Sequence, residues 1–334
     1  MQPYMAQRKK LMTDTKYAVV ITTHNRKQLL QECVDHVQHQ TIPPDNIIIV
    51  NNASTDGTEH YLKTLREQDK TTIDIINLSE NTGGAGGFAV GIERAAGTLA
   101  TWVLVIDDDA IIAPDYMEQI FAAAQQNLTH QAFAGAVTVN GEIDTCHRRN
   151  LTGIGLLSKN CKEEAYTQLC FVCDIASFCG MVIDLSLVRQ IGLPHAEYFI
   201  WYDDTEYSLR IHRYSRFLVV PQAVLYHKIT QIKKKHPRRY DWKEYYAVRN
   251  RLLMVQEHGT ILDRAVNFAN LFIHVIFRNW LFAVIKRDGY DWAYERKLVR
   301  KALCDVHKMR KKNTVLEKIP EEPKREGTAN AYFK

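Results

Sequence analysis

The stretch VLVIDDDAII, residues 103–112, places three adjacent aspartates directly after four apolar residues. An apolar run of this kind is typical of a buried strand. The three carboxylates repel one another, so a positively charged partner must offset them. Asp107 and Asp109 point the same way on an extended segment, because side chains alternate along a strand. Mg²⁺ and Mn²⁺ prefer such oxygen ligands, so the stretch predicts a divalent metal site; a solvated acidic turn is the alternative.

Strand and helix patterns alternate four times around this stretch. The apolar runs are YAVVITTHNR, DNIIIVNNAS, TIDIINLSEN and TWVLVIDDD, and helical spacing follows in KQLLQECVDHVQHQ, TEHYLKTLREQ, FAVGIERAAG and residues 114–126. This order predicts an α/β fold with a mainly parallel sheet covered by helices. Ligands of such sheets lie at the carboxyl ends of the strands, so the polar residues 22–26, 51–56, 81–87 and 107–109 should gather at one edge.

Composition narrows the class of protein. The 334 residues are 46% hydrophobic and 24% charged, which excludes global disorder and allows one large domain and a smaller one. The net charge of +5 is concentrated in clusters at 233–235, 238–239 and 308–312. Such clusters indicate an anionic neighbour, for example a membrane surface, or else a solvated basic face. Seven cysteines do not suggest a disulfide framework, so we expect a reducing, cytoplasmic setting.

The last third of the chain is basic, aromatic and helical in pattern. Its most apolar window, residues 266–285, contains Arg278 and several polar side chains, so it is too polar to predict a membrane span. An amphipathic helix, lying on a membrane or packed on protein, fits this window better. The N-terminus has no apolar core of signal-peptide length.

The glycine-rich stretch NTGGAGGFAVG, residues 81–91, follows a strand and opens a helix. It satisfies the G-x-G-x-x-G/A pattern, with aspartates about 20 positions further on, so an NAD(P)-dependent oxidoreductase is one interpretation. Against it, two strand–helix units precede the stretch, and a ribose needs only one of the three acids. Glycines also let a loop approach a ligand closely.

A second acidic stretch, FIWYDDTEYSLR, spans residues 199–210. Carboxylates beside aromatic rings and other carboxylates tend to have a raised pKa, which suits a general base. Asp203, Asp204 and Glu206 also suit a helix N-terminus, where negative charge favours the dipole. Further on, His227 ends the apolar run AVLY, and a lone histidine in that position is more often structural than a ligand.

Taken in order, the motifs VVITTHNR, IIIVNNASTDGT, NTGGAGGFAVG, VLVIDDDA, SFCGMVI, WYDDTEYSLR and LYHK resemble the family-2 glycosyltransferases with the GT-A fold. The resemblance covers residues 17–230. GGAGGF and WYDDTEY look most like bacterial galactofuranosyltransferases, with rhamnosyltransferases next. The resemblance implies a GT-A domain over 16–230, and we expect a basic aromatic helical subdomain over 231–312 and flexible tails over 1–15 and 313–334.

The resemblance also implies roles for individual residues. Asp107, Asp109 and His227 would bind a divalent Mn²⁺ or Mg²⁺, and Asp204 would be the catalytic base. Trp201, Tyr202, Asp203 and Glu206 would bind the acceptor, with the two acids holding either the acceptor or its loop. The donor nucleotide would contact Thr23, Asn25, Arg26, Asn51, Asn52, Asp56, Asn81, Gly83, Gly84, Asp107 and Asp108. Many relatives have Asp where this chain has Asn51, which leaves the base, uracil or thymine, open.

By the same resemblance, the expected reaction is an inverting, metal-dependent transfer of galactofuranose from UDP-galactofuranose to a hydroxyl of a glycan. The acceptor would be a glycan or lipid-linked glycan in cell-surface polysaccharide synthesis, such as O-antigen. A rhamnosyltransferase using dTDP-rhamnose is the second choice. We expect a cytoplasmic protein, peripheral on the inner face of the cell membrane if the basic third contacts anionic lipid. The aromatic residues of the last third would otherwise pack on the catalytic domain or form a homo-oligomer contact. No nucleic-acid partner is expected.

Overall fold

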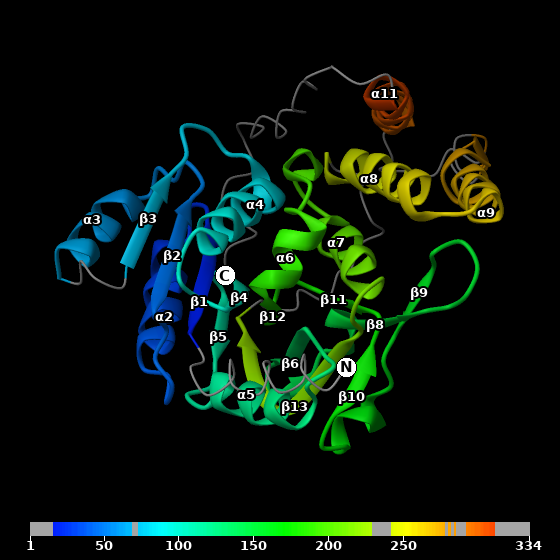
Figure 1. Ribbon diagram of the computed structural model, residues 1–334. Coiled ribbons are helices and arrows are strands. Elements are labelled where there is room, and N and C mark those ends of the chain that lie inside the picture. The colour runs from blue at the N-terminus through cyan, green and yellow to red at the C-terminus, as the bar shows by residue number, and fades with distance from the viewer. Residues whose placement is uncertain are drawn as a thin grey trace. The chain divides into compact units, whose positions relative to one another are not determined.

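The chain divides into two compact units between residues 232 and 233 in the computed structural model (Figure 1). The structure describes residues 16–68, 73–228, 242–277, 280–281, 284 and 292–310. Both predicted tails, 1–15 and 313–334, lie outside the described residues, as do the basic clusters at 233–235 and 238–239.

The predicted alternation of strands and helices is present in the first unit, and the α/β fold class is confirmed. The elements are β1 (Tyr17–Thr23), α2 (Lys27–Gln38), β2 (Asn46–Asn51), α3 (Thr58–Gln68), β3 (Ile73–Asn77), α4 (Gly83–Ala96), β4 (Trp102–Asp107), β5 (Ala110–Ile112) and α5 (Tyr116–Gln126). Helix α4 begins at Gly83, five residues before the predicted start at Phe88, so the glycine-rich stretch is helix and not loop.

The main sheet has the strand order β10-β13-β6-β12-β4-β1-β2-β3. Its later strands are β6 (Ala132–Val139), β10 (Phe171–Cys173), β12 (Met181–Asp184) and β13 (Phe217–His227). β1 pairs in parallel with β2 and β4, and β2 with β3, whereas β12 runs antiparallel between β4 and β6. The carboxyl ends of β1, β2, β3 and β4 therefore meet at one edge, as predicted.

Shorter elements complete this unit. They are β7 (Glu142–Ile143), β8 (Arg148–Leu151), β9 (Ser158–Asn160), β11 (Ile175–Ala176), the 3-10 turns η1 (Thr145–His147), η2 (Glu163–Thr167) and η3 (Ala196–Tyr198), and helices α6 (Leu185–Ile191) and α7 (Asp203–His212). β11, β8 and β9 form a separate small sheet.

The sheet is buried on both faces, which explains why its strands are apolar without alternation. On β1, Val19 and Ile21 join the core that includes residues of α2 and α5, and Val20 joins the core that includes residues of α4 and α7. Helices thus cover the two faces of one sheet (Figure 1). Gly87 lets α4 approach β1, because a β-carbon there would overlap the side chain of Thr22.

The second unit contains α8 (Lys243–His258), α9 (Ile261–Leu271), the π-helical segment η4 (Phe272–Phe277) and α11 (Trp292–Arg310). The hydroxyl of Tyr245 on α8 donates a 2.6 Å hydrogen bond to Asp305 on α11. α9 begins with a capping box between Thr260 and Asp263. Within the described residues, no helix is both long and apolar enough to cross a membrane.

Candidate active site

The three aspartates lie where β4 leaves the sheet. Thr22 of β1 pairs with Asp107 of β4, so the turn at 107–109 stands beside the end of β1. The hydroxyl of Thr23 donates a 2.7 Å hydrogen bond to Asp108, and both residues are buried. Strand pairing therefore joins residues 22–26, which include predicted donor-binding residues, to the acidic turn.

Arg26 supplies the positive charge that the acidic turn requires. Its Nη1 lies 3.1 Å from Asp108 Oδ1 and 2.7 Å from Asp109 Oδ2. The Arg26 side chain is half-exposed, whereas the two carboxylates are buried. Burial lowers the pKa of Arg26, but the carboxylates of Asp108 and Asp109 outweigh it and raise that pKa.

His227, the last residue of β13, reaches Asp109 from a segment far along the chain. β13 pairs antiparallel with β5, which sets His227 opposite Ala110. Nε2 of His227 lies 3.3 Å from Asp109 Oδ1, a buried oxygen that accepts no hydrogen bond from any other described group. The carboxylate of Asp109 and the imidazole of His227 offer donor atoms that a divalent cation accepts, and Asp107 is close enough to feel the charges of both.

The electrostatics of this cluster are those of crowded, buried charges. Burial, followed by the carboxylates of Asp109 and Asp108, raises the pKa of Asp107 to about 7. Burial opposes protonation of His227, but the hydrogen bond and charge of Asp109 outweigh it and raise the pKa of His227. Among the described residues, the cluster has three carboxyl groups and only two cationic side chains, Arg26 and His227. This imbalance favours binding of a further cation.

Residues 51–56, which also include predicted donor-binding residues, are hydrogen-bonded to the segment that follows β1. Asn25 accepts a 2.6 Å hydrogen bond from the amide of Thr55, and Asp56 accepts a 2.9 Å bond from the amide of Lys27. Asn51 donates a 2.8 Å bond to Asn77 at the end of β3. Asn25 and Asp56 thus brace the loops against each other, and Asn51 stands at the edge where the sheet ends.

Asn52 and Asn81 hold the start of α4. The amide of Asn52 donates 2.7 Å to the carbonyl of Gly83 and accepts 2.8 Å from the amide of Thr82. Asn81 accepts a 2.8 Å bond from the amide of Gly83. Because Asn52 is buried with both ends of its amide engaged, we assign it to positioning the α4 N-terminus, next to Gly84.

Gly83 also contacts the loop that carries the second acidic stretch. A β-carbon on Gly83, whose φ is +74°, would overlap the carbonyl of Phe199. The amide of Ala85 donates a 3.2 Å bond to that same carbonyl. Phe199, Trp201 and Tyr202 all have positive φ values of 64° to 67°. Non-glycine residues in this region are strained, and such strain clusters at functional sites.

The acids at 203–206 have different surroundings. Asp203 is buried, and burial followed by the charge of Asp204 raises the pKa of Asp203 to about 8. Asp204 accepts a 2.9 Å bond from Thr205, whose hydroxyl accepts 2.7 Å from Arg149. Asp107 acts electrostatically on Asp203, so the two acidic stretches are neighbours.

Glu206 has no exposed surface and forms a 2.7 Å ion pair with Arg210. This geometry favours the second of its two predicted uses, which is holding the loop and not the acceptor. Trp201, in the loop before α7, is 40% exposed.

One residue beside the cluster was not predicted. The ring of His147 packs edge-on against the ring of His227, with centroids 5.2 Å apart. His147 follows the short hairpin β6–β7, and nothing in its sequence context marks it. Only the pairing of β13 with both β5 and β6 brings the two histidines together.

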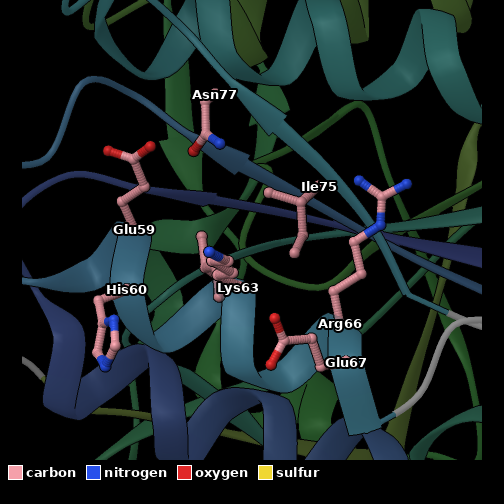
Figure 2. A pocket seen from close by; sticks show the side chains of 8 residues that line it. Glu59, His60, Lys63, Arg66, Glu67, Ile75 and Asn77 are labelled. Carbon is pink, nitrogen blue, oxygen red and sulfur yellow. The ribbon is translucent and has the colours of Figure 1, made fainter.

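A separate pocket of about 680 Å³ lies between α3 and β3, at the outer edge of the sheet (Figure 2). Its walls carry Glu59, Lys63, Arg66 and Glu67, and Asn77 lies at one end of the pocket (Figure 2). None of the residues predicted to bind donor, metal or acceptor lines it. Asn77 is its connection to the candidate site, through the hydrogen bond from Asn51.

Known proteins resemble this chain in sequence and in fold. Galactofuranosyltransferase GlfT1 of Mycobacterium tuberculosis (strain ATCC 25618 / H37Rv) is 27% identical over 309 residues, 87% of this chain and 97% of that protein. The dTDP-rhamnosyl transferase RfbF of Shigella flexneri is 22% identical over 256 residues, 74% of this chain and 82% of its own.

Solved structures share the fold at lower identity. S. aureus TarS 1-349 in complex with UDP-GlcNAc is 14% identical with a TM-score of 0.57, covering 87% of this chain and 80% of that one. GalNAc-T7 with UDP, GalNAc and Mn2+ is 16% identical with a TM-score of 0.58, covering 72% of this chain and 48% of that one.

The family model for glycosyl transferase family 2 matches residues 18–192, more than half of the chain. That range contains β1 to β12, the acidic turn and the start of α4, and the sheet has the expected GT-A arrangement. The chain therefore belongs to glycosyl transferase family 2, and it is a glycosyltransferase.

Proposed function

We propose that this glycosyltransferase is inverting and metal-dependent, and that it transfers galactofuranose from UDP-galactofuranose to a hydroxyl of a glycan or lipid-linked glycan. The observation that carries the proposal is the contact of His227 with Asp109, with Asp107 close enough to feel the charges of both. Asp203 is in turn close enough to feel the charge of Asp107. The name of the M. tuberculosis relative supports the choice of sugar. The S. flexneri relative keeps dTDP-rhamnose as the alternative donor.

Asp107, Asp109 and His227 are the residues that would hold the cation, and Mn²⁺ or Mg²⁺ suits them. Related structures of GalNAc-T7 and of the Pyrobaculum calidifontis mannosyltransferase PcManGT were solved with Mn2+. When bound, the cation would stabilise the charge that develops on the departing diphosphate. Thr23 holds Asp108 in place between Asp107 and Asp109 by a hydrogen bond from its hydroxyl.

Asp204 is the proposed general base. Its carboxylate takes the proton from the acceptor hydroxyl, and the oxygen forms a bond to the anomeric carbon as the bond to the diphosphate breaks. Thr205 donates to one oxygen of Asp204 and is itself held by Arg149, so the carboxylate is oriented before substrate arrives. Asp203, whose pKa is raised to about 8, adds little negative charge at neutral pH. Trp201 and Tyr202 would then contact the acceptor.

The donor nucleotide is proposed to lie along the strand ends, over Thr23, Arg26, Asn51 and the N-terminus of α4. A helix N-terminus attracts phosphate, because its free amides and dipole are positive. Asn51 carries both a donor and an acceptor, although its Nδ2 already binds Asn77. Either uracil or thymine is compatible with this amide.

The second unit is proposed to contact the inner face of the cell membrane, where a lipid-linked acceptor would lie. Ile261 is 84% exposed and Phe268 62% exposed on α9, and Phe272 and Phe277 of η4 are exposed as well. Apolar helical faces of this kind insert at lipid interfaces when basic residues accompany them. Sedimentation with liposomes, with and without anionic lipid, tests the membrane contact. The whole chain should pellet only with anionic vesicles, and the double variant Ile261→Asp, Phe268→Asp should no longer pellet with them.

The proposed function is tested by incubating the purified chain with glycan acceptors and either UDP-galactofuranose or dTDP-rhamnose, with Mn²⁺ or with EDTA. Product should form from UDP-galactofuranose with inverted anomeric configuration, and EDTA should prevent it. A thermal-shift panel makes a parallel test, in which UDP and Mn²⁺ together should stabilise the chain. Stabilisation by NAD(P) without metal would instead support the oxidoreductase interpretation and overturn the proposal.

A further inference from the structure

We propose that Asp144, Cys146 and His147 form a second cation site, which binds a softer divalent ion of the Zn²⁺ class. One ligand atom from each residue lies within 4.8 Å of the others. All three come from the short turn η1 and its cap, between β7 and β8. The site shares no residue with the proposed Mn²⁺ or Mg²⁺ site.

The turn η1 fixes the carboxylate of Asp144. Asp144 caps η1, and its Oδ1 accepts a 3.1 Å hydrogen bond from the amide of Cys146. Its Oδ2 is then directed toward His147, whose Nε2 is 3.8 Å away. A separation of this size exceeds a hydrogen bond and leaves room for an ion that binds both atoms at about 2.0–2.2 Å.

The imidazole of His147 is held in the orientation that a ligand needs. Its Nδ1 lies 2.8 Å from the hydroxyl of Ser177. When Nδ1–H donates to that hydroxyl, the lone pair is on Nε2, which faces Asp144. Metal-binding histidines are commonly fixed in this way, by a hydrogen bond from the second ring nitrogen.

The set of donor atoms determines which ion the site prefers. One thiolate, one imidazole and one carboxylate suit Zn²⁺, whereas Mg²⁺ and Mn²⁺ prefer oxygen. Cys146 is exposed, and the side chains of Asp144 and His147 are 24% and 13% exposed, so an ion can enter from solvent. On binding, the thiol of Cys146 releases its proton to the buffer and the sulfur coordinates the ion.

The position of this site links it to the transferase centre. The ring of His147 packs edge-on against that of His227, with 5.2 Å between centroids. His227 in turn lies 3.3 Å from Asp109. An ion held by His147 would therefore lie beside the proposed Mn²⁺ or Mg²⁺ site without occupying it. A soft metal ion would then bind next to the residues that we assign to the transfer reaction.

Cobalt substitution tests the proposal on the whole purified chain, without donor or acceptor. Co²⁺ bound to a thiolate gives a near-ultraviolet charge-transfer band, and Zn²⁺ should displace Co²⁺ and remove the band. Cys146→Ser should lose the band, whereas Cys304→Ser, a change at another exposed cysteine, should keep it. Ser177→Ala should weaken Zn²⁺ binding by about tenfold, since it frees the His147 ring.

Asp109→Asn separates this proposal from the proposed function. The variant should keep the Cys146-dependent band, because Asp109 is not a ligand of the second site. A wild-type chain that gives no thiolate band with Co²⁺, or a band that survives in Cys146→Ser, would overturn the proposal. Neither result depends on transferase activity, so the assignment of Asp107, Asp109 and His227 would be unaffected.

Discussion

Nη1 of Arg26 lies 2.7 Å from Asp109, so the guanidinium contacts one of the carboxylates that we assign to the cation. The same nitrogen is 3.1 Å from Asp108. Arg26 thus neutralises the acidic turn when no ion is bound, and it must share or leave Asp109 when one is. The half-exposed position of its side chain gives it room to move.

Arg26→Ala should destabilise the metal-free chain and strengthen its response to Mn²⁺. The free energy of unfolding should fall by only about 1 kcal/mol, because solvent screens the charge of a half-exposed guanidinium. The Mn²⁺-dependent rise in melting temperature should be larger than in the wild type, since no cation of the protein competes for Asp109. Lys27→Ala is the control, removing a neighbouring charge. An unchanged response to Mn²⁺ in Arg26→Ala would contradict the competition.

Asp109→Asn should weaken Mn²⁺-dependent binding of UDP as well as turnover. The amide keeps the shape of the side chain but loses the negative charge that faces His227 at 3.3 Å. Calorimetric titration of UDP with and without Mn²⁺ measures the effect. If Mn²⁺ enhances UDP binding equally in the variant and the wild type, Asp109 is not a ligand.

Asp204→Asn should lower turnover at least about a hundredfold while donor binding survives, because general-base catalysis contributes about 10² to 10⁴-fold. Initial rates and UDP affinity, measured on the same preparation, separate the two effects. Near-normal turnover would show that another group accepts the proton. Glu206→Gln should behave differently, losing stability through its ion pair with Arg210.

Asp203→Asn should become more stable than the wild type as pH rises. The pKa of Asp203 is raised to about 8, from an unfolded value of 3.8, mainly by burial and then by Asp204. Because the unfolded chain releases this proton near pH 3.8 and the folded chain only near pH 8, the wild type loses stability progressively between about pH 4 and pH 8. Denaturant unfolding of both chains over this pH range, without metal, should show that the difference in free energy of unfolding between the variant and the wild type grows as pH rises. A difference that does not change with pH would exclude the raised pKa.

Gly83→Ala should destabilise the chain by at least about 1 kcal/mol and lower turnover, since alanine is strained at positive φ. A β-carbon there would also overlap the carbonyl of Phe199 and displace the loop of Trp201. Gly84→Ala is a matched control, because its β-carbon would meet nothing closer than 3.8 Å. Equal melting temperatures and rates for the two variants would contradict the contact.

The strands, their order of appearance and the helices between them followed from the sequence, because burial on both faces imposes local apolar runs. The start of α4 did not. Its glycines indicate a loop when read locally, but Gly87 lies against Thr22 of β1, and helix packing on the sheet decides their conformation. The role of Glu206 likewise depended on Arg210, which lies one helical turn away and forms a 2.7 Å ion pair with it.

The sequence by itself determined that acids end the fourth strand of a parallel sheet, and that family resemblance marks Asp204 and His227. Only the tertiary structure decided what surrounds them: Arg26 over the aspartates, His147 against His227, and Phe199 against Gly83. The physical reason is the distance along the sequence between the residues that interact. Hydrophobic periodicity is set by neighbours along the chain, whereas these contacts join segments that only strand pairing and layer packing bring within a few ångströms.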